Sequence, residues 1–176
     1  MKKNKYCIEK YVSLLSCHPH ACAHIKGSEA YSQLHGLIRF YQTDNGTLIA
    51  SEIYGLPSTG EICRSPVFGF HIHEGSKCEG DTHDMFSKTM GHYNPEKCPH
   101  PFHSGDLPPL FGNHGYAFSV FLTDKFTVSE IIDKTVVIHG NPDDFETQPS
   151  GNSGEKLACG VVSTCMNRCN LSKKGV

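Results

Sequence analysis

The stretch FGFHIHEG, residues 68–75, places two histidines two positions apart. The residues around them alternate, with an apolar side chain at every second position and His71 and His73 between these. A period of two is typical of a β-strand, in which residues i and i+2 point to the same side. His71 and His73 should therefore stand side by side, opposite the apolar face. Two surface histidines are one interpretation, and two ligands aimed at one metal ion are the other.

A second group of metal-ligand residues lies further along, in the stretch GHYNPEKCPHPFHSGDLPPL. It contains His92, His100, His103 and Asp106. Zinc accepts imidazole nitrogen and carboxylate oxygen in a tetrahedral shell, and four protein ligands leave no open position, which suits a structural role. Prolines stiffen the stretch and lower the entropy cost of closing it around an ion. A solvated, histidine-rich loop is the alternative, but four suitable ligands so close together favour zinc.

His139 follows the apolar run VVI, near the end of an expected strand. Alone, such a histidine is more often a surface residue than a ligand. Beside His71 and His73 it would complete an all-imidazole site, which suits copper. Copper can cycle between two oxidation states and zinc cannot, so such a site would carry redox chemistry.

The elements that must position these residues read as short strands joined by turns. Alternating apolar runs predict strands at 34–42, 47–56, 67–75, 116–123, 134–140 and 156–162. Asn45-Gly46 is a strong hairpin signal between the first two, and 127–133 predicts one short helical turn that begins near Thr127 or Ser129. Residues 75 to about 115 lack apolar periodicity and read as a long, functional loop. The pattern predicts an all-β sandwich or barrel.

The composition of the 176-residue chain limits its class further. The length suggests one domain with a real core. The formal net charge is −2 and no basic stripe is present, so we expect no nucleic acid partner. No apolar run approaches a membrane span and the N-terminus lacks a secretory signal, so we expect a cytoplasmic protein with no membrane partner. Nine cysteines and twelve histidines indicate metals or free thiols.

Together, these motifs give the chain a resemblance to the copper/zinc superoxide dismutases over about residues 23–163. It rests on five stretches in family order and spacing: GFHIHEG, GHYNP, HSGDLP, VVIHGNPDD and GNSGEKLACGVV. The resemblance implies a Greek-key β-sandwich, or flattened eight-stranded barrel, with two long functional loops. We expect this domain at 22–163, a flexible extension at 1–21 and a C-terminal tail at 164–176.

The resemblance also implies a role for each matching residue. It makes His71, His73, His92 and His139 the copper ligands. It makes His92, His100, His103 and Asp106 the zinc ligands, so that His92 bridges the two metals. Asp143 matches the carboxylate that joins a copper histidine to a zinc histidine and fixes their ring orientations. Cys78 and Cys159 match the intrasubunit disulfide.

The implied function is dismutation of superoxide to dioxygen and hydrogen peroxide, with copper cycling between Cu(II) and Cu(I). His92 and Lys156 are the implied catalytic residues: the His92 ring takes a proton when copper is reduced, and Lys156 stands where the family has an arginine. Lysine is a flexible point charge rather than a rigid fork. With Glu155 beside it, we expect a slower enzyme whose rate depends weakly on ionic strength.

Two other functions stay open on the sequence. One is a non-enzymatic relative that stores or delivers copper or zinc, and Lys156 is the feature that favours it. The other is a structural zinc sandwich without copper. Superoxide is the expected substrate. The family contains monomers and dimers, so a homodimer and a copper chaperone are both candidate partners.

The stretch CHPHACAH, residues 17–24, offers further cysteines and histidines. One interpretation is a metal-acquisition arm that feeds the copper site. The favoured interpretation is a flexible segment that binds metals loosely. Cys165 and Cys169 in the tail are interpreted in the same way.

Overall fold

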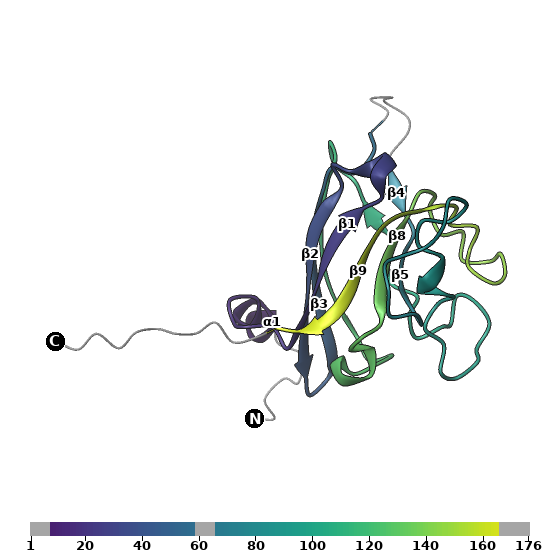
Figure 1. Cartoon of the computed structure of the whole chain (residues 1–176). Coiled ribbons are helices and arrows are strands. Elements are labelled where there is room, and N and C mark those ends of the chain that lie inside the picture. Colours follow the sequence, from purple (N-terminus) through teal and green to yellow (C-terminus); the bar gives the residue numbers. More distant parts are fainter. Residues whose placement is uncertain (1–7, 59–65, 166–176) are drawn as a thin grey trace, which may run out of the picture.

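The computed structural model describes residues 8–58 and 66–165. Within these residues one short helix precedes a series of β-strands, and three 3-10 turns lie in the connections (Figure 1). The helix and strands are α1 (Ile8–Leu15), β1 (Ala21–Gly27), β2 (His35–Thr43), β3 (Gly46–Tyr54), β4 (Val67–Phe68), β5 (Phe70–His73), β6 (Leu110–Phe111), β7 (Tyr116–Thr123), β8 (Thr135–His139) and β9 (Lys156–Thr164). The 3-10 turns are η1 (Glu29–Tyr31), η2 (Ser87–Thr89) and η3 (Val128–Ile131).

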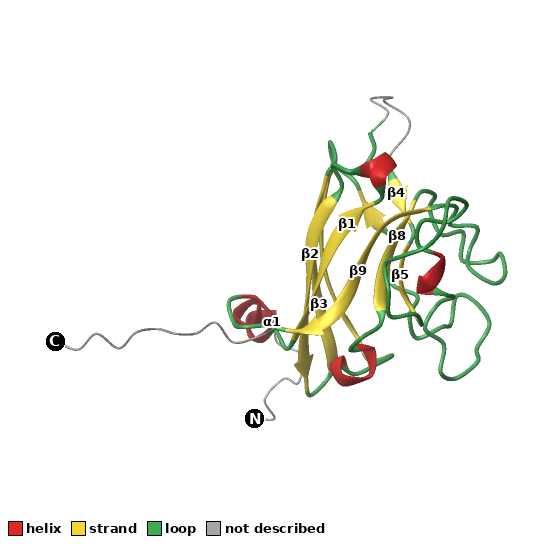
Figure 2. Ribbon diagram, in the orientation of Figure 1, coloured by secondary structure: helices red, strands yellow, loops and turns green. Residues whose placement is uncertain are grey.

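Seven strands form one antiparallel sheet in the order β5-β8-β9-β1-β2-β3-β7, and β4 pairs with β6 in a second, short sheet. The large sheet is curled (Figure 2). The short sheet links its two edge strands, because β4 leads into β5 and β6 contacts β7. Only Gly69 separates β4 from β5, and counting them as one interrupted strand gives eight strands. The expected all-β Greek-key architecture is confirmed.

The core lies inside the curled sheet and is built by the alternation that the sequence shows. Ile38, Phe40, Ile49, Phe70 and Ile138 each expose none of their surface. They come from four different strands, so their inward side chains meet in one cluster. Burying aliphatic and aromatic side chains of this size stabilises each by roughly 1.5–3 kcal/mol, which is the main force that holds the strands in place.

Two long connections lie outside the sheets in the described part of the chain. One runs from Glu74 to Pro109 and contains η2, and the other runs from Gly140 to Glu155. Both lie on the same side of the barrel, against β5 and β8 (Figure 1). The expectation of two long loops is therefore confirmed, and the loops cover the strands that carry His71, His73 and His139.

The short turns lie at or next to the positions that the sequence predicts. The β2–β3 hairpin turns at Asp44-Asn45, one residue earlier than the Asn45-Gly46 signal. Gly46 begins β3 with a φ of 125°, which favours glycine. Thr127 caps η3: its side chain accepts a hydrogen bond from the turn while Glu130 accepts from the Thr127 amide, a capping box.

The N-terminal region differs from the expectation of an irregular, flexible segment. Residues 8–15 form α1, and its Tyr11, Leu14 and Leu15 pack on Tyr41 and its apolar neighbours on the outer face of the sheet. Spacings of three and four residues put these side chains on one helix face. The expected domain boundaries stay a prediction, and residues 1–7 and 166–176 lie outside the described part.

The stretch CHPHACAH lies partly within the sheet, and its binding of metals stays a prediction. Its second half begins β1, which pairs with β2 on one side and β9 on the other, in the middle of the large sheet. Ala21, Ala23 and Ile25 are buried while His24 is exposed. Cys165 follows β9, and its amide donates to the His20 carbonyl at 3.3 Å. Cys169 lies outside the described residues.

A disulfide joins Cys78 in the first long loop to Cys159 in β9, as the resemblance implies. The two Cα atoms are 5.6 Å apart and the residues are 81 positions apart in sequence. The bond ties the loop to the sheet beside Phe86 and Val137.

We expect Cys78→Ser to destabilise the metal-free protein by about 4 kcal/mol, because the cross-link closes a long loop and restricts the unfolded chain. Denaturant unfolding with and without a thiol reductant measures the effect. Cys98→Ser is the matched control, because Cys98 is a free cysteine in the same loop. If the unfolding midpoint of the wild-type protein is the same with and without the reductant, the prediction is contradicted.

Candidate metal centre

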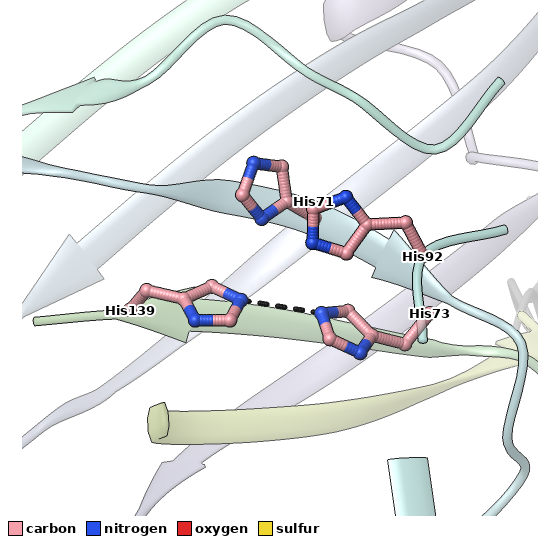
Figure 3. A group of neighbouring side chains, drawn as sticks. All are labelled: His71, His73, His92 and His139. Carbon is pink, nitrogen blue, oxygen red and sulfur yellow. Dashed lines mark hydrogen bonds between the residues drawn. The ribbon is translucent and has the colours of Figure 1, made fainter. Parts of the chain in front are cut away.

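Four histidines meet between β5, β8 and the first long loop. His71 and His73 lie on β5, His139 ends β8, and the loop brings His92 against them through a bridge to His73 (Figure 3). One ligand nitrogen from each ring lies within 4.8 Å of those of the other three. His73 Nε2 is 3.2 Å from His139 Nε2. Two nitrogens that bind one ion at about 2.0–2.1 Å lie about 3 Å apart, so this spacing fits a shared metal.

The four rings are buried, so the interpretation of His71 and His73 as two surface histidines is wrong. His71, His73 and His139 expose 0%, 2% and 4% of their surface. All four residues of β5 are buried. The long loops lie against β5 and cover the face that carries the histidines, which the sequence alone would leave exposed (Figure 1). Four imidazoles without a carboxylate form a donor set that suits copper.

A second group adjoins the first and shares His92 with it. Ligand atoms of His92, His100, His103 and Asp106 also lie within 4.8 Å of one another. Asp106 Oδ1 is 2.7 Å from His92 Nδ1 and 3.3 Å from His103 Nδ1, and Asp106 Oδ2 is 3.1 Å from His100 Nδ1. Three imidazoles and one carboxylate form a closed donor set that suits zinc.

Three buried ring nitrogens make no hydrogen bond: His71 Nδ1, His92 Nε2 and His100 Nδ1, the last of which lies 3.1 Å from Asp106 Oδ2, a fellow member of the zinc group. A buried polar atom without a partner is costly, because it has lost its contact with water. Each of these rings uses its other nitrogen in a contact with a carboxylate. The unpartnered nitrogens therefore fit metal ligation, and the two groups fit copper and zinc.

Asp143 connects the two groups. His71 Nε2 donates to Asp143 Oδ2 at 2.7 Å, and His100 Nε2 donates to Asp143 Oδ1 at 2.8 Å. Burial alone would raise the pKa of Asp143, but the hydrogen bonds from His71, the Phe145 amide and His100 outweigh it and hold this pKa far below its usual value. The carboxylate therefore fixes which nitrogen of each ring is left for a metal.

A backbone carbonyl orients the His73 ring and an amide side chain holds the backbone of His100, and sequence analysis missed both contacts. His73 Nδ1 donates to the Met90 carbonyl at 2.9 Å. Gln148 joins the loops, since its Oε1 accepts from the His100 amide at 3.0 Å and its Nε2 donates to the His100 carbonyl at 2.8 Å. Carbonyls leave no mark in a sequence, and Gln148 lies in a polar stretch without periodicity.

Burial favours the neutral form of the His73 and His139 rings. Desolvation lowers the pKa of His73 well below its usual value, and the His139 and His92 rings add to the effect. Desolvation and the neighbouring His71 lower the pKa of His139 to about 3. A neutral imidazole is the form that binds a metal.

We expect acid to destabilise the metal-free protein. Between about pH 3 and the unfolded histidine pKa of about 6.5, the unfolded chain binds more protons at His139 than the folded chain does. Stability is therefore complete above this range and falls as the pH drops through it. Thermal midpoints across this range measure the slope, which should be shallower in His139→Ala and unchanged in exposed His83→Ala. A midpoint that rises on acidification would contradict the assignment.

A cavity of about 370 Å³ opens onto both metal groups, and its walls include His73, His92, His103, His139 and Lys156. Lys156 begins β9 and exposes 15% of its side chain. Its Nζ donates to Asp84 Oδ2 at 2.7 Å and to the Phe86 carbonyl at 3.2 Å. The structure thus places Lys156 beside the histidines, as expected, and adds Asp84, which the sequence did not single out.

Comparison with known proteins agrees with this geometry. Residues 34–162 match the family model described as copper/zinc superoxide dismutase. The chain is 37% identical to "Superoxide dismutase [Cu-Zn] 1" of Aquifex aeolicus over 142 residues, which cover 72% of this chain and 79% of that protein. It is 32% identical to "Superoxide dismutase [Cu-Zn]" of Escherichia coli K12 over 149 residues, 77% of this chain and 82% of that protein.

The chain therefore belongs to the copper/zinc superoxide dismutase family. It is an oxidoreductase with a copper group and a zinc group that share His92. Within the described residues, the one α-helix is too short to cross a membrane.

Proposed function

We propose that superoxide approaches the copper histidines through the 370 Å³ cavity and that Lys156 attracts it there. The observation that carries the proposal is the position of Lys156, which lines the same cavity as His73, His92 and His139. Copper held by the four histidines supplies the electron exchange, by alternating between Cu(II) and Cu(I). Superoxide is an anion, so a lysine ammonium on the cavity wall favours its entry.

His92 is placed to serve both metal groups. Its Nδ1 lies 2.7 Å from Asp106 Oδ1, on the zinc side, and its Nε2 is buried without a hydrogen-bond partner. The ring centroid is 4.0 Å from that of His71 and 4.9 Å from that of His73. We propose that Nε2 takes up a proton when it is not bound to a metal and gives that proton to the peroxide product.

The surroundings of Lys156 support the expectation of a slower, weakly steered enzyme. Asp84 pairs with its ammonium, and Glu155 is its neighbour in sequence. The loop segment from Asp144 to Gly154 contains no lysine. Long-range attraction scales with net charge, so a cation beside two carboxylates attracts anions weakly at a distance.

We expect Lys156→Gln to lower the dismutation rate constant about 3-fold or more at low salt, because the variant leaves Asp84 and Glu155 unopposed. Pulse radiolysis of the copper- and zinc-loaded protein measures the rate. Lys156→Arg keeps the charge and should keep or raise the rate. Lys88→Gln is the control, because Lys88 forms an exposed ion pair with Glu79 in the first long loop. A wild-type rate that falls steeply with added salt would contradict weak steering. A slow rate with both metals fully bound would instead favour the storage or delivery function.

The cytoplasmic location, a homodimer and a copper chaperone remain proposals from the sequence and the resemblance. Fractionation of the native host tests the first, and the mass of the purified protein in solution tests the second. Copper loading of the protein in cells that lack a chaperone tests the third.

A further inference from the structure

Lys156 lies between two cavities. One is the 370 Å³ cavity that holds the copper histidines, and the other has a volume of about 470 Å³. Lys156 lines both, whereas Asp84 lines only the second, together with Tyr31, His83 and Glu155. The ion pair with Asp84 therefore draws the Lys156 ammonium toward the 470 Å³ cavity, which is not lined by the copper histidines.

Asp84 is fixed in its place by the backbone of its own loop. Its Oδ1 accepts from the Phe86 amide at 2.9 Å, and its Oδ2 accepts from Lys156. The Asp84 carbonyl accepts from the amides of Asp81 and Ser87, each at 3.0 Å. The Asp84 amide in turn donates to the Asp81 carboxylate at 3.2 Å. Because the amide, the carbonyl and the carboxylate of Asp84 are all hydrogen-bonded, the Asp84 side chain is held in place. The position of the ion pair is therefore set by Asp84 and not by Lys156.

The second contact of the ammonium acts in the same direction. Lys156 Nζ donates to the Phe86 carbonyl at 3.2 Å, and Phe86 is buried beside the disulfide that ties this loop to β9. Two acceptors on one anchored loop therefore define the position of the ammonium. The 2.7 Å hydrogen bond to Asp84 is charge-assisted, and such bonds are shorter and stronger than neutral ones.

We propose that Asp84 is a positioning residue that holds Lys156 back from the copper cavity and limits how strongly the enzyme attracts anions. The inference rests on the proposed role of Lys156 and adds to it. Lys156 contributes one positive charge, while Asp84 and Glu155 contribute two negative charges beside it. Lys156 already lines the copper cavity, and its release from Asp84 would leave its ammonium unpaired there, where superoxide passes.

The test compares Asp84→Asn with Glu79→Gln in the copper- and zinc-loaded protein. Asparagine can still accept from the Phe86 amide, but it cannot hold Lys156 by charge. Glu79→Gln removes the same charge from the same loop and breaks an exposed ion pair with Lys88. The readouts are the dismutation rate at low and high salt and the affinity of azide for the Cu(II) form, measured from its absorption spectrum.

We expect Asp84→Asn to raise the low-salt rate and the azide affinity about 3-fold or more above the Glu79→Gln control, with a steeper loss of rate as salt is added. Each substitution is then repeated in the Lys156→Gln background. Without Lys156, the gain from Asp84→Asn should fall to that of the charge control, because independent charges add while coupled residues do not. Asp84→Glu should stay near wild type.

The outcomes distinguish the proposed role of Lys156 from the proposed positioning role of Asp84. Equal gains from Asp84→Asn with and without Lys156 would overturn the inference, since Asp84 would then act only as a charge. If Lys156→Gln lowers rate and azide affinity while Asp84→Asn changes neither, the role of Lys156 survives and the inference fails. If Lys156→Gln itself changes neither, the proposed role of Lys156 fails and the inference fails with it.

Discussion

Replacement of His139 by alanine should lower the superoxide dismutation rate by more than about 100-fold, beyond the loss usual for a residue that only supports a metal ligand. His139 ends β8, where the register against β9 shifts. Its Nε2 faces His73 Nε2 at 3.2 Å, so the variant removes one side of the copper group. Three histidines would remain, and the zinc group would keep all of its ligands.

The measurement has two parts. Pulse radiolysis gives the rate, and metal analysis after dialysis gives the copper and zinc content. Copper should be lost or held loosely while zinc stays near one equivalent. His114→Ala is the matched control, because His114 is exposed and belongs to neither metal group. A His139→Ala protein that keeps the wild-type rate would show that the four-histidine group is not the site of reaction.

The metal ligands could be predicted because both their types and their order along the chain carry the information. His71 and His73 share a strand face by simple alternation, and the loop histidines gather at a density that chance seldom produces. The burial of the rings could not be predicted in this way. It comes from two long loops that fold back over β5 and β8, and such loops have no periodic signal.

The N-terminal region shows where pattern reading fails. ACAHIKG does alternate, but its inward residues include two alanines, which give little apolar signal, and its outward residues looked like metal ligands. Only pairing with β2 and β9 shows it to be a central strand. Helix α1 has eight residues, too few to be stable alone, so it depends on packing against Tyr41 and its neighbours.

Lys156 and Asp84 illustrate the same limit at the cavity. Lys156 was found by its place in a motif, but its partner lies 72 positions away in a loop with no matching motif. A charge pair formed across such a distance depends on how the loop is anchored. Here the anchors are the Cys78–Cys159 disulfide and the hydrogen bonds around Asp84.

Asp143→Asn should weaken the binding of copper and of zinc together, with about 10–100-fold losses in metal affinity or activity. The carboxylate accepts from His71 on one oxygen and from His100 on the other. An asparagine offers one oxygen and one NH2 group, so it can accept from only one of the two rings. The other ring would face the NH2 group, which is also a donor. That ring would have to rotate or move its proton to the other nitrogen, and the nitrogen that binds the metal would then be lost.

Competition with chelators, for copper and zinc separately, measures the two affinities, and pulse radiolysis measures the rate. Glu146→Gln is the matched control, because Glu146 is an exposed carboxylate in the same loop. A loss confined to one metal would show that the asparagine oxygen keeps one ring in place. Losses of both metals that match in size would show that the two rings depend equally on Asp143. Unchanged affinities for both would contradict the role of Asp143 as the link between the groups, and the ring orientations would then have to come from the metals alone.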